Sequence, residues 1–324
     1  MARRTRGVRS AHDTAPGRAG ANVAEGAGDL LVAARTLVHG LHQGAHRADT
    51  RGASTEFYDY RAASPGDPAH AIDWKVFGRT DRHYIRRFRH ETQLTVGIAL
   101  DASASMEFAG FDADASPSKL RRAKELAAAV AHLVVRQGDR VCLAAGAGER
   151  GQVVAPGSGW EHLHVVARAL ESVTPVGDSG LTGALDACAA SMHRRGLVVA
   201  IGDGLDDPAA LLERLARLRF GAGRSFGAQG GTVGAGHDVV MLQTLTPDEL
   251  DISRLERARL VDPETGADAL GSGEFNAARY RDEMRLHLER IRSGVVGMHG
   301  RWALARTDAD PREALRRVFD PRGR

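Results

Sequence analysis

The chain has 324 residues, 43% of them hydrophobic and 26% charged, which suits a globular protein with one large or two smaller domains. Its net charge of +3 comes from the first twenty residues, where five arginines stand against one aspartate, so the folded part is not expected to bind nucleic acid. No apolar stretch is long enough for a membrane span, and no secretory leader is visible. The two cysteines, Cys142 and Cys188, suit buried thiols better than a disulfide framework, so we expect a cytoplasmic protein.

The N-terminal third divides into a tail and a small block. Residues 1–26 are rich in arginine, alanine and glycine without periodicity, and we expect a disordered basic tail. Apolar residues at helical spacing predict a helix over 28–41, and strands are predicted at 54–60 and 84–91. Together these elements predict a small α+β block over residues 27–93.

From residue 94 onwards, predicted strands and helices alternate. Apolar, β-branched segments predict strands at 94–100, 141–145, 152–155, 197–201, 239–242 and 301–305. Apolar residues at helical spacing predict helices at 117–137, 160–173, 181–194, 208–219, 275–292 and 311–319. The glycine-rich stretch 221–236 predicts a flexible loop or insertion. Such alternation is typical of an α/β fold with a doubly wound, mainly parallel sheet, here over residues 94–324.

Three oxygen-bearing side chains follow the strand predicted at 94–100. They are Asp101, Ser103 and Ser105, at every second position. Burying such groups costs free energy unless something satisfies their hydrogen-bonding capacity, and a hard divalent cation would satisfy all three. A turn followed by a helix cap is the alternative, because aspartate and serine are common in both.

A second apolar strand, predicted at 197–201, is followed by Asp203. In open parallel sheets, ligands bind at the carboxyl ends of the strands where the strand order reverses. If the two strands are neighbours at that point, Asp101 and Asp203 face one crevice. Thr182 begins the helix before the second strand and would add a hydroxyl from a third loop. Oxygens from three loops favour a metal site over a helix cap.

These residues resemble a known pattern. Asp101-Ala-Ser103-Ala-Ser105, Thr182 within Gly-Leu-Thr-Gly and Asp203 within Ile-Gly-Asp-Gly resemble the metal-ion-dependent adhesion site of von Willebrand factor type A domains. Upstream, the chain resembles the signature of the DUF58 family, which joins such a block to a von Willebrand A-like domain, at residues 56–61, 65–67, 72–75 and 79–80. Gly202 departs from the related domains, which often have serine there. Many family members carry N-terminal membrane helices. No such helix is predicted in this sequence, which therefore resembles the soluble branch of the family.

The resemblance implies a metal-dependent interaction module. Hydroxyl oxygens would come from Ser103, Ser105 and Thr182, and the carboxylates of Asp101 and Asp203 would bind directly or through water. The ion would be Mg²⁺, with Mn²⁺ or Ca²⁺ as substitutes. A remaining coordination position would accept a Glu or Asp of a protein partner. Family context points to an AAA+ ATPase of the MoxR class, with this chain as an adaptor or chaperone component that has no catalytic residue.

Two alternative functions remain open, and a third motif is argued against by the segment that follows it. A Mg²⁺-dependent hydrolase or phosphotransferase would use Asp101 as a phosphoryl acceptor, although Ser103 stands where a second carboxylate would be expected. The glycines of 146–151 match a dinucleotide-binding pattern, but the next segment predicts a strand rather than the helix that this pattern requires. A basic nucleic-acid binder would act through the tail 1–26.

Overall fold

The chain divides into two compact units, residues 44–93 and residues 1–43 together with 94–324. The computed structural model describes residues 16–38, 56–64, 72–89, 93–111, 116–146, 151–177, 180–221, 236–252 and 277–319. Among the helices in these ranges, none is both long and apolar enough to cross a membrane. Residues 1–15 of the predicted tail and 222–235 of the predicted insertion lie outside the described residues.

The smaller unit contains a two-stranded antiparallel sheet and one short helix. Strand β1 (Glu56–Ala62) pairs with β2 (Tyr84–Arg89), close to the two strands expected from the sequence. Helix α2 (Trp74–Thr80) was not indicated by the sequence pattern, because it has only seven residues. It is capped by Asp73, whose carboxylate accepts hydrogen bonds from the backbone N–H groups of Lys75 and Val76.

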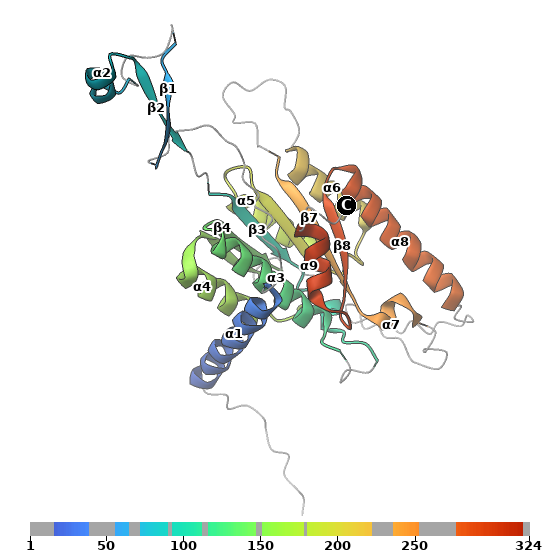
Figure 1. Ribbon diagram of the computed structural model, residues 1–324. Coiled ribbons are helices and arrows are strands. Elements are labelled where there is room, and N and C mark those ends of the chain that lie inside the picture. The colour runs from blue at the N-terminus through green and yellow to red at the C-terminus, as the bar shows by residue number, and fades with distance from the viewer. Residues whose placement is uncertain are drawn as a thin grey trace, which may run out of the picture. The chain divides into compact units, whose positions relative to one another are not determined.

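Helix α1 (Pro16–Val38) corrects two expectations. It begins at Pro16, so the expectation of disorder is wrong for residues 16–26. It also belongs to the larger unit, not to a block spanning 27–93. Leu30, Ala34 and Val38 form one buried stripe in the core of that unit. The helix packs beside α3 (Lys119–Arg136) and α4 (Gly159–Ser172) (Figure 1). An apolar stripe needs a large apolar surface to cover it, and the six-stranded domain supplies one.

A six-stranded sheet forms the centre of the larger unit. Its strands are β3 (Thr95–Leu100), β4 (Arg140–Ala145), β5 (Gln152–Gly157), β6 (Leu197–Gly202), β7 (Asp238–Leu245) and β8 (Arg301–Arg306). The spatial order is β5-β4-β3-β6-β7-β8, and every neighbouring pair is parallel except β4 with β5. The chain goes from β3 outward to β5 and returns to the other side of β3 at β6. The predicted doubly wound, mainly parallel sheet is therefore confirmed, with its reversal between β3 and β6.

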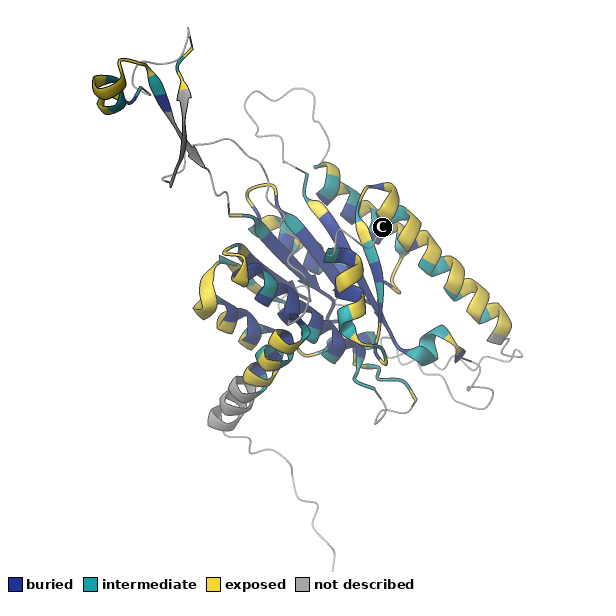
Figure 2. Cartoon of the chain, in the orientation of Figure 1, coloured by how far each residue is buried: buried dark blue, intermediate teal, exposed yellow. Residues whose placement is uncertain are grey.

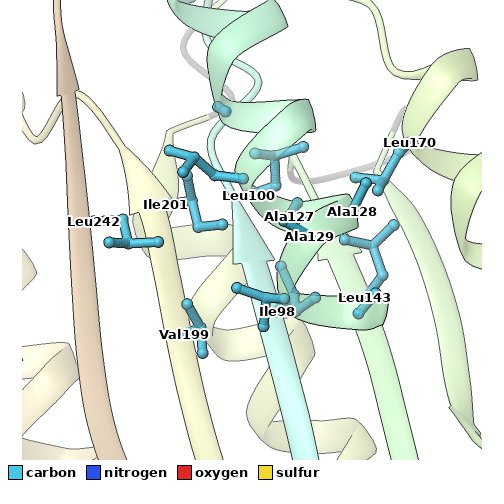
Figure 3. Close-up of a cluster of buried hydrophobic side chains, with 14 of the residues drawn as sticks. Ile98, Leu100, Ala127, Ala128, Ala129, Leu143, Leu170, Val199, Ile201 and Leu242 are labelled. Carbon is cyan, nitrogen blue, oxygen red and sulfur yellow. The ribbon is translucent and has the colours of Figure 1, made fainter. Parts of the chain in front are cut away.

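Helices cover both faces of this sheet. They are α3 (Lys119–Arg136), α4 (Gly159–Ser172), α5 (Leu181–Ser191), α6 (Pro208–Phe220), α8 (Ala277–Gly297) and α9 (Pro311–Phe319), besides α1 and the short α7 (Pro247–Leu250). Successive strand residues point to opposite faces, so Ile98 and Leu100 contribute to a core with α1, α3, α4 and α9, whereas Ala99 packs with α5, α6 and α8. Figure 3 shows the part of the first core where Ile98 and Leu100 lie near Ala127 of α3. Figure 2 shows the central strands buried beneath both helical layers.

The two cysteines lie where buried thiols were expected. Cys142 on β4 and Cys188 on α5 are both free and buried. Gly97 on β3 lies beneath them, and a Cβ atom at this position would come within 2.3 Å of the Cys188 sulfur. The absence of a side chain at Gly97 therefore lets α5 pack closely on the strand that ends at Asp101.

Candidate metal centre

The candidate site lies at the carboxyl ends of β3 and β6, the two neighbouring strands at which the order reverses. Asp101 follows β3 directly and Asp203 follows β6, and each is 1% exposed. The backbone N–H of Asp101 donates a 2.8 Å hydrogen bond to the carbonyl of Ile201 and joins the two strand ends. The structure thus brings together the two acids that the sequence placed at one edge of the sheet.

The loop after β3 aligns its two serines. The Asp101 Oδ1 atom accepts a 2.9 Å hydrogen bond from the backbone N–H of Ser103, which turns the chain into the short 3-10 helix η2 (Ala104–Glu107). In this turn the Oγ atoms of Ser103 and Ser105 lie 3.0 Å apart. The Ser105 hydroxyl donates a 2.9 Å hydrogen bond to Oδ2 of Asp203. A continuous row of oxygens therefore runs from the β3 loop to the β6 loop.

The oxygens of this row are held together by hydrogen bonds. The separations of 3.0 and 2.9 Å in the row Ser103–Ser105–Asp203 are ordinary O–H···O lengths. Among the described residues, no group of three or more His, Cys, Asp or Glu side chains is arranged to hold a metal. Binding here would therefore depend on hydroxyl oxygens as well as carboxylates.

Thr182 is less closely tied to the site than the other four residues. It is the second residue of α5 and is half-buried, and the hydrogen bonds between described residues do not join it to any of the other four. The loop before α5 does reach the site, because Ala104 N–H donates to the Gly177 carbonyl and Val176 N–H donates to the Ala102 carbonyl, both at 2.9 Å. The structure thus brings the third predicted loop to the β3 loop, without a hydrogen bond from Thr182 among those described.

Two glycines shape the loop after β6. A Cβ atom at Gly202 would lie 2.6 Å from the Asp101 Cβ, so a side chain there would displace the carboxylate. This close approach accounts for glycine where related domains often have serine. Gly204 has a positive φ of 62°, and the next N–H, from Leu205, donates a 3.1 Å hydrogen bond to Oδ1 of Asp203. Oδ2 of Asp203 is thereby left facing Ser105.

The electrostatic state of Asp101 reflects its burial. Burial, and then the nearby negative charge of Asp203, raise the pKa of Asp101 to about 8, although hydrogen bonds from Ser103 oppose the rise. In the metal-free protein the carboxyl of Asp101 is therefore mainly protonated at neutral pH. A cation that bound here would have to displace this proton.

The structure adds two charged residues that the sequence analysis missed. Lys119 is fully buried, and its Nζ atom lies 2.7 Å from Oδ2 of Asp203 and 2.5 Å from Oε1 of Glu249. Burial disfavours the ammonium, but the attraction of Asp203 and Glu249 outweighs it, so the pKa of Lys119 lies above its ordinary value. The N-cap of α3 is Ser118, so Lys119 is the first residue of the helix. The helix therefore begins two residues after Pro117, where it was predicted to begin. The only local signal for Glu249 was its capping-box spacing from Thr246.

Two mycobacterial proteins are similar to this chain in sequence. An uncharacterized protein of Mycobacterium bovis and one of Mycobacterium tuberculosis are each 27% identical over 247 residues, which cover 73% of this chain and 72% of theirs.

Two solved structures resemble the fold at low sequence identity. The VWA domain of SpRpn10 matches with a TM-score of 0.39 and 9% identity, over 69% of this chain and 94% of that one. The PilB minor pilin of Streptococcus sanguinis matches with a TM-score of 0.34 and 12% identity, over 74% and 62% of the two chains.

The family comparison covers most of the chain. Residues 59–289 match the family model described as "Protein of unknown function DUF58". The match includes β2 and the part of β1 from residue 59 onwards, both strand ends of the candidate site, Lys119 and Glu249. This agrees with the resemblance seen in the sequence, and the chain belongs to the DUF58 family.

Proposed function

We propose that this protein is a metal-dependent interaction module that binds Mg²⁺ at the ends of β3 and β6 and, through the ion, an acidic side chain of a partner protein. The observation that supports the proposal is the row of oxygens from Ser103, Ser105 and Asp203 beside the buried Asp101. An oxygen-only set of ligands at a compact site suits a hard divalent cation, and we propose Mg²⁺, with Mn²⁺ as the nearer substitute.

The donor set suits recognition of an anion. Hydroxyl oxygens carry no charge, so two carboxylates, Asp101 and Asp203, would at most neutralise a divalent ion and leave it attractive to a further carboxylate. Ser103, Ser105 and Thr182 would complete the set. The family resemblance points to an AAA+ ATPase of the MoxR class as the partner, in the cytoplasm. We propose no catalytic role, because Asp101 is assigned to the metal and Ser103 stands where a phosphoryl-accepting site would have a second carboxylate.

The metal proposal is tested by thermal unfolding. At a Mg²⁺ concentration about 100-fold above its Kd, we expect the Tm of the wild type to rise by about 5–10 °C, because the ion binds only the folded state. Asp101→Ala and Asp203→Ala should show no rise. Asp186→Ala is the matched control, because this carboxylate lies on α5, is 55% exposed and pairs with Arg214 away from the site. An equal Mg²⁺ response in Asp101→Ala would show that the ion binds elsewhere.

The partner is tested separately with purified components. A purified MoxR-class ATPase should bind the wild type in Mg²⁺. It should not bind the wild type in EDTA, and it should not bind Asp101→Ala in Mg²⁺. Hydrolysis of a phosphoester by the purified chain in Mg²⁺, lost in Asp101→Ala, would instead favour the enzymatic alternative.

A further inference from the structure

Lys119 is the most unusual residue near the candidate site. It is a fully buried lysine at the first position of α3, where helix N-termini ordinarily favour acidic residues. Its ammonium lies 2.7 Å from Oδ2 of Asp203, the same oxygen that accepts the hydroxyl hydrogen of Ser105. The proposed function assigns this oxygen to the metal. The Lys119 ammonium and the proposed metal ion would therefore compete for Oδ2 of Asp203.

Glu249 fixes the other side of the ammonium. Its Oε2 atom accepts hydrogen bonds from the backbone N–H and the hydroxyl of Thr246, at 2.8 and 3.0 Å. Its backbone carbonyl accepts a 3.1 Å hydrogen bond from the Tyr280 hydroxyl. Only Oε1 is directed to Lys119, at 2.5 Å. The Lys119 ammonium thus lies between the carboxylate of Asp203, which belongs to the oxygen row, and the carboxylate of Glu249, which does not.

The charges explain why a lysine is needed there. A buried carboxylate without a counter-charge is costly, and in the metal-free protein the ammonium of Lys119 supplies the counter-charge to Asp203. A divalent cation at the oxygen row would lie close to that ammonium and would be repelled by it. Relief is available because the lysine stem is flexible and Glu249 offers a second partner.

We propose that Lys119 is a built-in competitor of the metal, which occupies Oδ2 of Asp203 in the metal-free protein and is transferred wholly to Glu249 when a divalent cation binds. This inference rests on the proposed metal site. Lys119 and Glu249 are then positioning residues: the lysine weakens metal binding and keeps the empty site folded, and the glutamate strengthens metal binding by receiving the lysine.

The test measures Mg²⁺ affinity by isothermal titration calorimetry in four proteins: wild type, Lys119→Met, Glu249→Gln and the double variant. Lys119→Met should bind Mg²⁺ about tenfold more tightly, because a competing unit charge is removed. Glu249→Gln should bind several-fold more weakly. In the Lys119→Met background, Glu249→Gln should change the affinity by less than about twofold, because its effect acts through the lysine. The double variant leaves only Asp203 without its counter-charge, whereas Lys119→Met leaves both Asp203 and Glu249 without one.

The control is Lys124→Met, on the same helix. This lysine is buried, but its Nζ donates to the Glu171 carbonyl at 3.0 Å, away from the site, so Mg²⁺ affinity should not change. A variant that only damaged the fold would bind Mg²⁺ more weakly, not more tightly. Wild-type binding with no gain in Lys119→Met, or strictly additive effects of the two substitutions, would overturn the inference alone. Binding by Lys119→Met but not by the wild type would support it and overturn the proposed function, and binding by neither would overturn both.

Discussion

The two carboxylate oxygens of Asp203 have different partners, because Oδ1 bonds within its own loop and Oδ2 faces the candidate site. Oδ1 accepts a hydrogen bond from the Leu205 N–H in its own loop, and Oδ2 accepts from Ser105 and Lys119. Because the backbone fixes Oδ1, the orientation of Oδ2 is set before any ligand arrives. Gln243 adds to this by donating a 2.8 Å hydrogen bond to the Asp203 carbonyl. Binding of a cation would therefore rearrange hydrogens and the Lys119 ammonium more than it would rearrange the loop.

The raised pKa of Asp101 predicts a pH dependence. The ordinary value is 3.8 and the folded value is about 8, so between these values the folded protein holds a proton that the unfolded chain has lost. The contribution of Asp101 to the free energy of unfolding therefore falls as the pH rises from about 4 to about 8. Mg²⁺ must displace the same proton, so its affinity should rise about tenfold per pH unit below pH 8 and level off above it.

Calorimetry in buffers of different ionisation enthalpy checks this prediction. Close to one proton should be released for each Mg²⁺ bound at about pH 6.5, and almost none at about pH 9. A Mg²⁺ affinity that is constant across this range would mean that Asp101 is already ionised in the metal-free protein.

At the scale of the element, helix α1 forms part of the larger unit. Its buried stripe packs into the core that α3 and α4 share with the sheet. Neighbouring positions on the same helix differ sharply, because Leu30 is 0% exposed whereas Val32 is 67% exposed. The helix is therefore held by one face, and its contribution to stability belongs to the larger unit.

A pair of substitutions in α1 tests this packing. Leu30→Ala should lower the free energy of unfolding by about 2–5 kcal/mol, because it leaves a cavity in a closely packed core. Val32→Ala, the matched control on the exposed face, should change it by less than about 0.5 kcal/mol. Chemical denaturation measures both. Equal, small effects of the two substitutions would show that α1 does not pack on the domain.

At the scale of the whole molecule, the candidate site is built by one of the two units. Every hydrogen bond described for Asp101, Ser103, Ser105, Asp203 and Lys119 joins residues of the larger unit. The smaller unit, residues 44–93, has its own hairpin and capped helix. If the proposed function is correct, metal binding belongs to the larger unit alone.

Removal of the smaller unit tests this assignment. Replacing residues 44–93 by a Gly/Ser linker of about 20 residues should leave a folded protein whose Mg²⁺-induced rise in Tm matches that of the full chain. Circular dichroism and the same thermal assay measure both properties. A folded variant that had lost the Mg²⁺ response would show that the smaller unit contributes to the site.

The sequence by itself determined the sheet and the place of the site. Each strand is a local apolar run, and Asp101 and Asp203 each follow such a run directly, so their meeting at one edge follows from parallel strands. The serine spacing was equally local, and the structure joins Ser103 to Ser105 and Ser105 to Asp203.

Only the tertiary structure decided which charged residues complete the site and which unit α1 joins. Lys119 is 84 residues from Asp203 and 130 from Glu249, and in the sequence it is one basic residue among several at the start of a helix. Glu249 has the spacing of an ordinary helix cap. Burial and counter-charge arise from packing between distant segments, and hydrophobic periodicity records only the local structure of each segment.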